Sequence, residues 1–330
     1  MIYAASQFKN EVDVLEIRLE TIGEYVDRFV LAEATTDQRG YPRELVFLQH
    51  KERFEPWLDK IEYVVVEDMP PRDGPGGDTH EADVMRERWQ RDALRRGMPD
   101  LRDDDLVYVS DLDEIPTPEA LEEGLANPPL RFGMDLHVYA LNWRWLDRGC
   151  RIGTLGAVLH GIDILEMSVC WAVLWDQRVE GRPGVSGWHL TYQGGVEAIR
   201  SKITGMMDKH EALVMPGVDP AEVLTDEWIE RSIKTGTDIF GRTYRPTEWV
   251  DLDQLPPVVQ KHPERYAHMM VPRPANQDEI EAQARCTCGG IFSDDEFRTL
   301  MHFEYCALAG QPDVVVVPLD ERAEPRAESV

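Results

Sequence analysis

The feature that most constrains the fold is an alternation of short apolar runs and amphipathic segments through the first third of the chain. Residues 28–34 have the almost continuously apolar sequence RFVLAEA, and residues 61–68 and 106–109 repeat this pattern. Continuously apolar strands separated by helices are typical of a parallel sheet that is covered on both faces. Strands and helices are expected to alternate, beginning with a strand, over residues 1–6, 11–23, 28–34, 45–58, 61–68, 80–97, 106–114 and 117–125.

The segment 80–97 is expected to be a helix with one apolar stripe. Met85, Trp89 and Ala93 recur at helical spacing, and Gly97 follows as a stop signal. The same segment carries a group of arginines: Arg86, Arg88, Arg91, Arg95 and Arg96. They form either a solvated face with neighbouring acids, or a group from which one or two side chains reach a phosphate ligand.

The composition restricts the classes of partner. The 330 residues carry a formal net charge of −27, which opposes binding to nucleic acid or anionic lipid unless a local basic patch exists. No apolar run approaches the ~20 residues of a membrane span, and no signal peptide is visible at the N-terminus. The five cysteines are unevenly spaced and do not suggest a disulfide framework. We therefore expect a cytoplasmic protein without a membrane partner.

A cluster of acids follows the fourth expected strand, where Asp111, Asp113 and Glu114 lie close together. Carboxylates at this spacing repel one another. Acidic loops are common, so the cluster needs no ligand; alternatively, it binds a divalent cation, which takes oxygen ligands and removes the repulsion. An Asp-x-Asp motif is too short to decide between these interpretations by itself.

The position of the cluster in the expected sheet favours the cation. Glu33 and Asp68 also fall at the ends of expected strands. Ligands of parallel α/β sheets bind beyond the carboxyl ends of the strands. We therefore expect Glu33, Asp68 and the acid cluster to share one rim.

Five segments, in this order, resemble glycosyltransferase family 17: EVDVLEIRL, DRFVLAEAT, KERFEPWLDKIEYVVVEDMP, RERWQRDAL and DDDLVYVSDLDEIPTPEAL. The likeness continues through DLHVYALNWRW and GWHLTYQGG. It is weaker in LTDEWIERSIKTGTDIF and LPPVVQKHPERYAHM, so that it covers roughly residues 1–270. Bacteria and their viruses carry shorter relatives. The resemblance therefore implies a short bacterial or viral member, located in the bacterial cytoplasm or in that of a viral host.

This resemblance implies an α/β protein of the GT-A fold, with a Rossmann-like, mostly parallel sheet and flanking helices. The nucleotide-sugar half is expected at about 1–125 and the acceptor half at about 126–270. The implied reaction is an inverting transfer of a sugar from a nucleotide-diphosphate donor, a UDP-sugar such as UDP-N-acetylglucosamine, to a hydroxyl of a glycan or another acceptor. The implied cofactor is Mn²⁺ or Mg²⁺. The expected donor-binding residues are Glu33, Thr35, Arg86, Arg91, Asp111 and Trp188, and the expected ligands of the cation are Asp111, Asp113 and His189.

An inverting transfer also needs a base that takes the proton of the acceptor hydroxyl, and that base should be a carboxylate. The sequence leaves four catalytic candidates open: Glu114, Asp163, Glu166 and Asp176.

The segment GWHLTYQGG has glycines on both sides, which suggests a tight loop that approaches another group closely. His189 is expected either to complete the shell of the cation or to bind a sugar, and Trp188 to stack on a sugar face. A Trp-His pair that serves only packing is the alternative.

The last part of the chain departs from the family. Residues 271–285 are expected to be a linker, 286–310 a small zinc-finger-like unit and 311–330 a tail. Three thiols and an imidazole make a tetrahedral structural zinc site, here formed by Cys286, Cys288, His302 and Cys306. The unusual Cys-x-Cys spacing leaves open the alternative of buried thiols and an incidental histidine.

Three other functions remain open. A glycosyltransferase with a zinc unit can act on a modified, hydroxymethylated DNA base. A non-catalytic, zinc-containing protein that associates with nucleic acid is a second possibility. A nucleotidyltransferase ranks lower, because its glycine-rich phosphate loop is absent near the N-terminus. The complete Asp111, Asp113 and Glu114 set favours glycosyl transfer.

Overall fold

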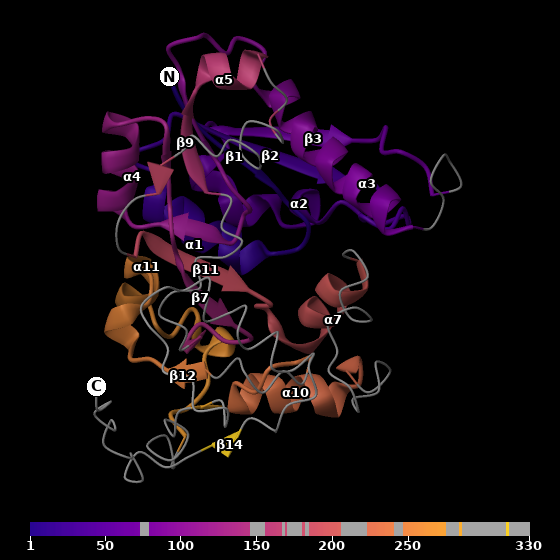
Figure 1. The fold of residues 1–330 in the computed structure, drawn as a ribbon, viewed down its shortest axis with the longest axis vertical. Coiled ribbons are helices and arrows are strands. Elements are labelled where there is room, and N and C mark those ends of the chain that lie inside the picture. Colours follow the sequence, from indigo (N-terminus) through magenta and orange to yellow (C-terminus); the bar gives the residue numbers. More distant parts are fainter. Residues whose placement is uncertain are drawn as a thin grey trace, which may run out of the picture.

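The computed structural model describes residues 1–72, 79–145, 156–166, 169, 180–181, 185–205, 223–240, 247–274, 284–285 and 315–316. Within them the chain forms two main sheets with helices on their faces. In Figure 1 the larger sheet, with β1, β2, β3 and β9, lies in the upper half, and the smaller one, with β7, β11 and β12, lies in the lower half.

The larger sheet has seven strands in the order β10-β6-β9-β4-β1-β2-β3. Its parallel part confirms four predicted strands: β1 (Ile2–Gln7), β2 (Arg28–Ala34), β3 (Ile61–Val66) and β4 (Leu106–Val109). The strand expected over 106–114 ends at Val109, because the chain leaves the sheet there and Glu114 joins the second sheet. The other three strands are β6 (Leu130–Arg131), β9 (Ala157–His160) and β10 (Glu180–Gly181). Because β9 runs antiparallel to both β4 and β6, the sheet is mixed, with parallel pairing concentrated in the predicted half.

The helices between these strands also follow the prediction, with one exception. The first half contains α1 (Val12–Ile22), α3 (His80–Asp92) followed by the 3-10 helix η2 (Ala93–Gly97), and α4 (Pro118–Ala126). The single helix expected over 45–58 is wrong. The chain forms instead the short α2 (Val46–Gln49) and the 3-10 helix η1 (Lys51–Trp57), because Pro56 lies inside and Phe54 leaves helical geometry.

The second sheet was not predicted as a separate element. Its five strands have the order β12-β8-β7-β11-β5. They are β5 (Glu114–Pro116), β7 (Asp135–Val138), β8 (Trp143–Trp145), β11 (Gly187–Thr191) and β12 (Thr247–Trp249). Helix α5 (Gly161–Glu166) packs on β9 of the larger sheet. The helices of the part with the second sheet are α7 (Gly195–Gly205), α10 (Asp226–Thr235) and α11 (Pro257–Lys261), with the short 3-10 helices η3 (Leu252–Gln254) and η4 (Ala267–Met269).

Helix α1 lies between the two sheets (Figure 1). Leu15 and Leu19 pack in the core under the larger sheet, whereas Val14 and Ile17 pack in the core of the smaller one. Since both faces of the helix are covered, its charged Glu16 and Arg18 are fully buried. Burial on both faces was not evident from the apolar stripe in the sequence.

Helix α3 is turned the opposite way from the prediction. Two members of the expected apolar stripe, Met85 and Trp89, are on the outside with 41% and 42% exposure, and only Ala93 is buried as expected. The arginine-bearing face packs inward, with Arg86 at 0% and Arg91 at 3% exposure. The interpretation of these two arginines as members of a solvated face is therefore wrong, since polar contacts at the sheet edge decide which face of the helix is buried.

Some predictions fall outside the described residues, among them Asp176, the zinc-finger-like unit and its four ligands Cys286, Cys288, His302 and Cys306. In the last part of the described chain, two short strands, β13 (Ala284–Arg285) and β14 (Val315–Val316), pair with each other. Within the described residues, no helix combines the length and the apolar character needed to cross a lipid bilayer.

Candidate functional site

The acid cluster lies on a loop that joins the two sheets. Ser110 to Asp113 follow the carboxyl end of β4, and Glu114 begins β5 of the second sheet. The backbone N–H of Leu190 in β11 donates to the carbonyl of Asp113 at 2.8 Å, and Glu114 pairs with His189 in the strand register. The predicted position at the carboxyl edge of the parallel sheet is therefore confirmed.

The side chain of Arg18, in α1, binds this loop through several hydrogen bonds. Its Nη1 donates to the backbone carbonyls of Asp111, Leu112 and Glu114, at 3.3, 3.3 and 2.8 Å. Its Nη2 donates to the hydroxyl of Ser110 at 2.9 Å. A buried carbonyl without a hydrogen-bond donor would raise the free energy of the folded state. Because the buried guanidinium of Arg18 donates to the carbonyls of the loop, it stabilises this loop conformation.

Each aspartate of the motif has a cationic partner of its own. The carboxylate of Asp111, 37% exposed, accepts a hydrogen bond from Nη2 of Arg91 at 3.0 Å. The carboxylate of Asp113, 6% exposed, accepts one from Nζ of Lys202 in α7 at 2.7 Å, and Nε2 of His189 lies 3.5 Å from its other oxygen. The repulsion within the cluster is therefore offset by side chains of the protein itself.

These contacts control the charge of Asp113 and Lys202. Burial alone would raise the pKa of Asp113, but the positive charge of Lys202 and the proximity of His189 outweigh it and hold this pKa below its ordinary value. Burial alone would lower the pKa of Lys202, but the negative charge of Asp113 raises it above its ordinary value. The two groups therefore form a shielded ion pair.

A second lysine lies next to this pair. Nζ of Lys9, just after β1, donates to the backbone carbonyl of Ser201 in α7 at 2.7 Å. Burial is the main cause that lowers the pKa of Lys9 to about 8; Glu11 and Asp37 act against this shift, and Arg43 and Lys202 add to it. Lys9 and Lys202 therefore bring two amines to one turn of α7 at the carboxyl edge of the sheet.

The donor set fits a divalent cation in part. Asp113 and His189 supply an oxygen and a nitrogen 3.5 Å apart, and the ammonium of Lys202 marks a place where positive charge is held. Across the residues that the structure describes, no three side chains of His, Cys, Asp or Glu stand close enough to share one ion. Mg²⁺ typically binds through one or two carboxylates and completes its shell with water and substrate phosphates, and two protein ligands suit that mode.

Among the predicted donor-binding residues, Glu33 is fully buried. Its carboxylate accepts hydrogen bonds from Arg43, from the backbone N–H groups of Val46 and Phe47, and from the hydroxyl of Tyr63. These contacts tie the end of β2 to α2 and β3. Thr35, two residues further on, bonds through its backbone N–H to the carbonyl of Val66 at 3.1 Å.

Polar atoms are buried where the loop after β2 meets α3. Nε of Arg86 donates to the carbonyl of Gln38 at 2.8 Å. In this part of the described chain, Nη1 of Arg86, Oε1 of Gln38 and the hydroxyl of Thr36 are buried without a hydrogen-bond partner. Buried polar atoms normally have partners, so these three are available to a ligand or to water.

Trp188 and His189 point to opposite faces of β11, as neighbours in a strand do. Trp188 packs on the core that contains Val14 and Ile17, and its indole N–H donates to the carbonyl of Gln254 at 2.8 Å. The structure thus brings His189 to Asp113 but turns Trp188 away from it.

The candidates for the catalytic base are distributed over both edges of the larger sheet. Oε2 of Glu114 accepts a hydrogen bond from the backbone N–H of Asp111 at 3.2 Å, within the loop. Asp163 and Glu166 lie on α5, which follows His160, and His160 pairs with Leu106 at the start of β4. These two carboxylates are therefore at the edge opposite to Asp113. Asp176 lies outside the described residues.

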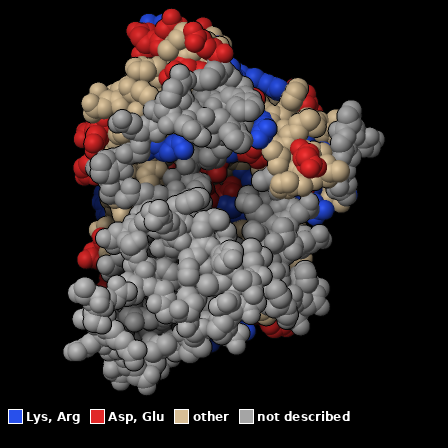
Figure 2. Space-filling model, viewed as in Figure 1, with Lys and Arg blue, Asp and Glu red and all other residues tan. Residues whose placement is uncertain are grey.

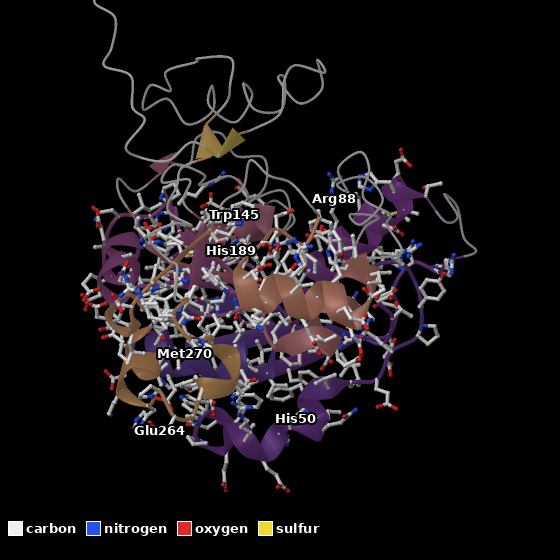
Figure 3. The ribbon with its side chains drawn as sticks, turned by 90° about the horizontal axis from the view of Figure 1, so that it is seen from below. His50, Arg88, Trp145, His189, Glu264 and Met270 are labelled. Atoms are coloured by element: carbon white, nitrogen blue, oxygen red, sulfur yellow. The ribbon has the colours of Figure 1, made fainter. Side chains whose placement is uncertain are left out.

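Figures 2 and 3 show the charged side chains on one face and the position of His189. Figure 2 shows acidic and basic side chains side by side in a recess near the middle of this face. In Figure 3, His189, Trp145 and Arg88 lie toward one side of the molecule, whereas His50 and Glu264 lie toward the opposite side. His189 of β11 and Arg88 of α3 thus come from different layers to the same side.

Arg18, Lys9 and Lys202 were not among the site residues that the sequence indicated. Arg18 occupies an ordinary helical position, and only burial of α1 on both faces makes it part of the site. Lys202 is 89 residues from Asp113 in the chain, and its helix carries no motif. No local signal could have identified either residue.

The fold and the site define a class of protein. A mixed α/β sheet with acidic and basic side chains at the carboxyl ends of its parallel strands is the arrangement of α/β proteins that bind ligands at this edge. Residues 1–144 match the family model of Glycosyltransferase family 17. The chain is therefore similar to this family over that region, which confirms the resemblance found in the sequence.

Curated relatives agree with this match. The beta-1,4-mannosyl-glycoprotein 4-beta-N-acetylglucosaminyltransferases of Rattus norvegicus and Homo sapiens are each 30% identical to the chain over 171 residues, and that of Mus musculus is 29% identical. The matched segment is 48% of this chain and 31% of each relative. The chain thus spans about a third of the length of the curated relatives it matches.

Proposed function

We propose that the chain is a glycosyltransferase of the GT-A type that moves a sugar, with inversion, from a nucleotide-diphosphate donor to an acceptor hydroxyl. The observation that carries this proposal is the Asp111–Glu114 loop at the carboxyl edge of the parallel sheet, within the region that matches Glycosyltransferase family 17. The relatives transfer N-acetylglucosamine, as their name states, so UDP-N-acetylglucosamine is the first donor to test. A glycan is the proposed acceptor, and no finding supports modified DNA.

The donor would lie along this edge of the sheet. Its nucleoside would approach the loop after β2, where Thr36, Gln38 and Arg86 have buried polar atoms without partners in the described structure. Its diphosphate would lie next to Asp113 and near the amines of Lys9 and Lys202, which bring positive charge to a chain of net charge −27. The positive charges of these two amines offset the negative potential of the acidic protein where the anionic diphosphate must bind.

The transfer breaks the bond between the anomeric carbon and the donor phosphate and forms one to the acceptor oxygen. The departing diphosphate gains negative charge, and the acceptor hydroxyl loses its proton to a base. Asp113 and His189 would hold Mn²⁺ or Mg²⁺, which supplies Lewis-acid stabilisation to the leaving diphosphate when bound. Lys202 and Arg91 lie next to the motif and would add to this stabilisation.

A panel of nucleotide sugars tests the proposal without knowledge of the acceptor. Slow hydrolysis of one donor, dependent on Mn²⁺ or Mg²⁺, is the expected result, together with thermal stabilisation by the matching nucleoside diphosphate. Replacing Asp113→Asn should lower this hydrolysis at least about a hundredfold, because removing a group that stabilises the developing charge typically costs that much.

The matched control is Asp163→Asn, which removes a carboxylate at the opposite edge of the sheet. This variant should keep the activity of the wild-type protein. A protein that hydrolyses none of the donors and is stabilised by none of the nucleotides would contradict the proposed function.

A further inference from the structure

Lys202 reaches the acid loop from the other half of the molecule. It lies in α7, and its ammonium donates to Oδ2 of Asp113 at 2.7 Å. Both side chains are shielded, with exposures of 13% for Lys202 and 6% for Asp113. The ring of Tyr192 lies 5.6 Å from the same ammonium. A monovalent positive charge thus stands at the carboxylate on which the proposed divalent cation depends.

The ammonium and a divalent cation would compete for this carboxylate. His189 lies 3.5 Å from Oδ1 of Asp113, so the imidazole and Lys202 together cover both carboxylate oxygens. Two positive charges a few ångströms apart repel strongly where solvent screening is weak. Each must therefore weaken the binding of the other, by the same factor.

A displaced ammonium in a shielded site needs another negative charge nearby. Nζ of Lys9 bonds to the carbonyl of Ser201, the residue before Lys202, so two amines flank one turn of α7. An anion that enters between the sheet edge and α7 meets both of them. The diphosphate of a nucleotide donor has the charge and the position to take over the ammonium that Asp113 releases.

We propose that Lys202 is a built-in counter-ion that holds the place of the divalent cation in the donor-free protein and passes to the diphosphate of the donor when that cation binds Asp113. The proposal rests on the proposed function for the identity of the anion. It makes Lys202 a donor-binding residue that also opposes premature binding of the metal.

Mutation at this position separates the two effects. Lys202→Met keeps the length of the side chain and removes its charge, and Lys202→Arg keeps the charge. Lys234→Met, on the exposed side of α10, is the matched control. Mn²⁺ affinity is measured by calorimetric titration without nucleotide, and UDP affinity is measured with saturating Mn²⁺.

Lys202→Met should bind Mn²⁺ about tenfold more tightly and UDP about tenfold more weakly than the wild-type protein, within the usual range of coupling between sites. Lys202→Arg should retain UDP binding, and Lys234→Met should change neither affinity. The proposal is overturned if Lys202→Met binds Mn²⁺ no more tightly than the wild-type protein, or if no variant binds Mn²⁺ at all. It is also overturned if Lys202→Met binds UDP as tightly as the wild-type protein.

A measurement on the wild-type protein covers the case in which Lys202→Met does not fold. The rate at which Lys202 is acetylated, followed by mass spectrometry, should rise when Mn²⁺ is added and fall again when UDP follows. A rate that Mn²⁺ leaves unchanged contradicts the exchange. None of these measurements requires sugar transfer, so a failure of the donor panel and a failure of this proposal are distinguishable.

Discussion

Nη1 of Arg18 donates a hydrogen bond to the backbone carbonyl of Glu114 at 2.8 Å and thereby connects the helix between the two sheets to the loop that carries the acids. The guanidinium is fully buried and also lies 5.1 Å from the centre of the Tyr108 ring. The hydroxyl of Tyr108 donates to the same carbonyl at 2.9 Å. The geometry of the acid loop therefore depends on α1, which is far from it in sequence.

Replacing Arg18→Met should destabilise the fold by roughly 3 kcal/mol, because it removes four hydrogen bonds to the loop and leaves the carbonyl of Leu112 without its donor in a dry environment. Denaturation by urea measures this change. Arg96→Met is the control, since Arg96 pairs with Asp68 at the surface and such pairs contribute roughly 1 kcal/mol or less. Equal stability of the two variants would show that the loop does not need Arg18.

The free energy of unfolding should decrease at acidic pH because of His137. This side chain is 1% exposed, and its burial is the main cause that lowers its pKa to about 4. The hydrogen bond to the carbonyl of Leu141 acts against this shift, whereas Arg144 and His189 add to it. The unfolded chain takes up the proton first as the pH falls. The contribution of neutral His137 to the free energy of unfolding is therefore fully present above pH ~6.5 and is lost as the pH falls through 4. The total loss is about 3 kcal/mol at most.

Urea denaturation at several pH values between 7 and 4 measures this loss of stability. The variant His137→Asn lacks the imidazole, so the part of the pH dependence that comes from His137 should disappear. Other groups titrate equally in both proteins, so the difference between the two curves isolates His137. His50→Asn, at an exposed position, should follow the wild-type curve. Parallel curves for wild-type protein and His137→Asn would contradict the prediction.

Glu114 is expected to position the loop rather than accept the proton of the acceptor. Its Oε2 faces the backbone N–H of Asp111, and Glu114→Gln retains an oxygen that can accept this bond. Turnover of Glu114→Gln should remain within about tenfold of wild type, whereas loss of a general base typically costs about a hundredfold or more. Initial rates with the best donor decide this, and a large loss together with normal UDP binding would make Glu114 the base.

Zinc in the last part of the chain stays a prediction, because Cys286, Cys288, His302 and Cys306 lie outside the described residues. Purified protein should contain about one zinc per chain, and Cys306→Ser should lose it, since structural zinc needs four ligands. Elemental analysis provides the measurement. Cys170→Ser is the control and should retain the metal; wild-type protein that is folded and free of zinc would contradict the site.

Several features of this protein follow from sequence alone. The strands β1 to β4 and the helices α1, α3 and α4 are local patterns of apolar residues, caps and stops. The carboxyl ends of parallel strands meet at one edge whatever the details of packing, so Asp111 and Asp113 could be placed there before the structure was known. The resemblance of the first part to glycosyltransferase family 17 was equally visible in the order of its segments.

The tertiary structure decided which side chains complete that edge. The antiparallel course of β9 removes Asp163 from the acid loop, burial of α1 on both faces brings Arg18 beneath it, and α7 delivers Lys202 across 89 residues of chain. Such contacts depend on how distant elements stack rather than on local periodicity. Sequence patterns therefore indicate where a site forms, whereas the packing of distant elements determines which charges occupy it.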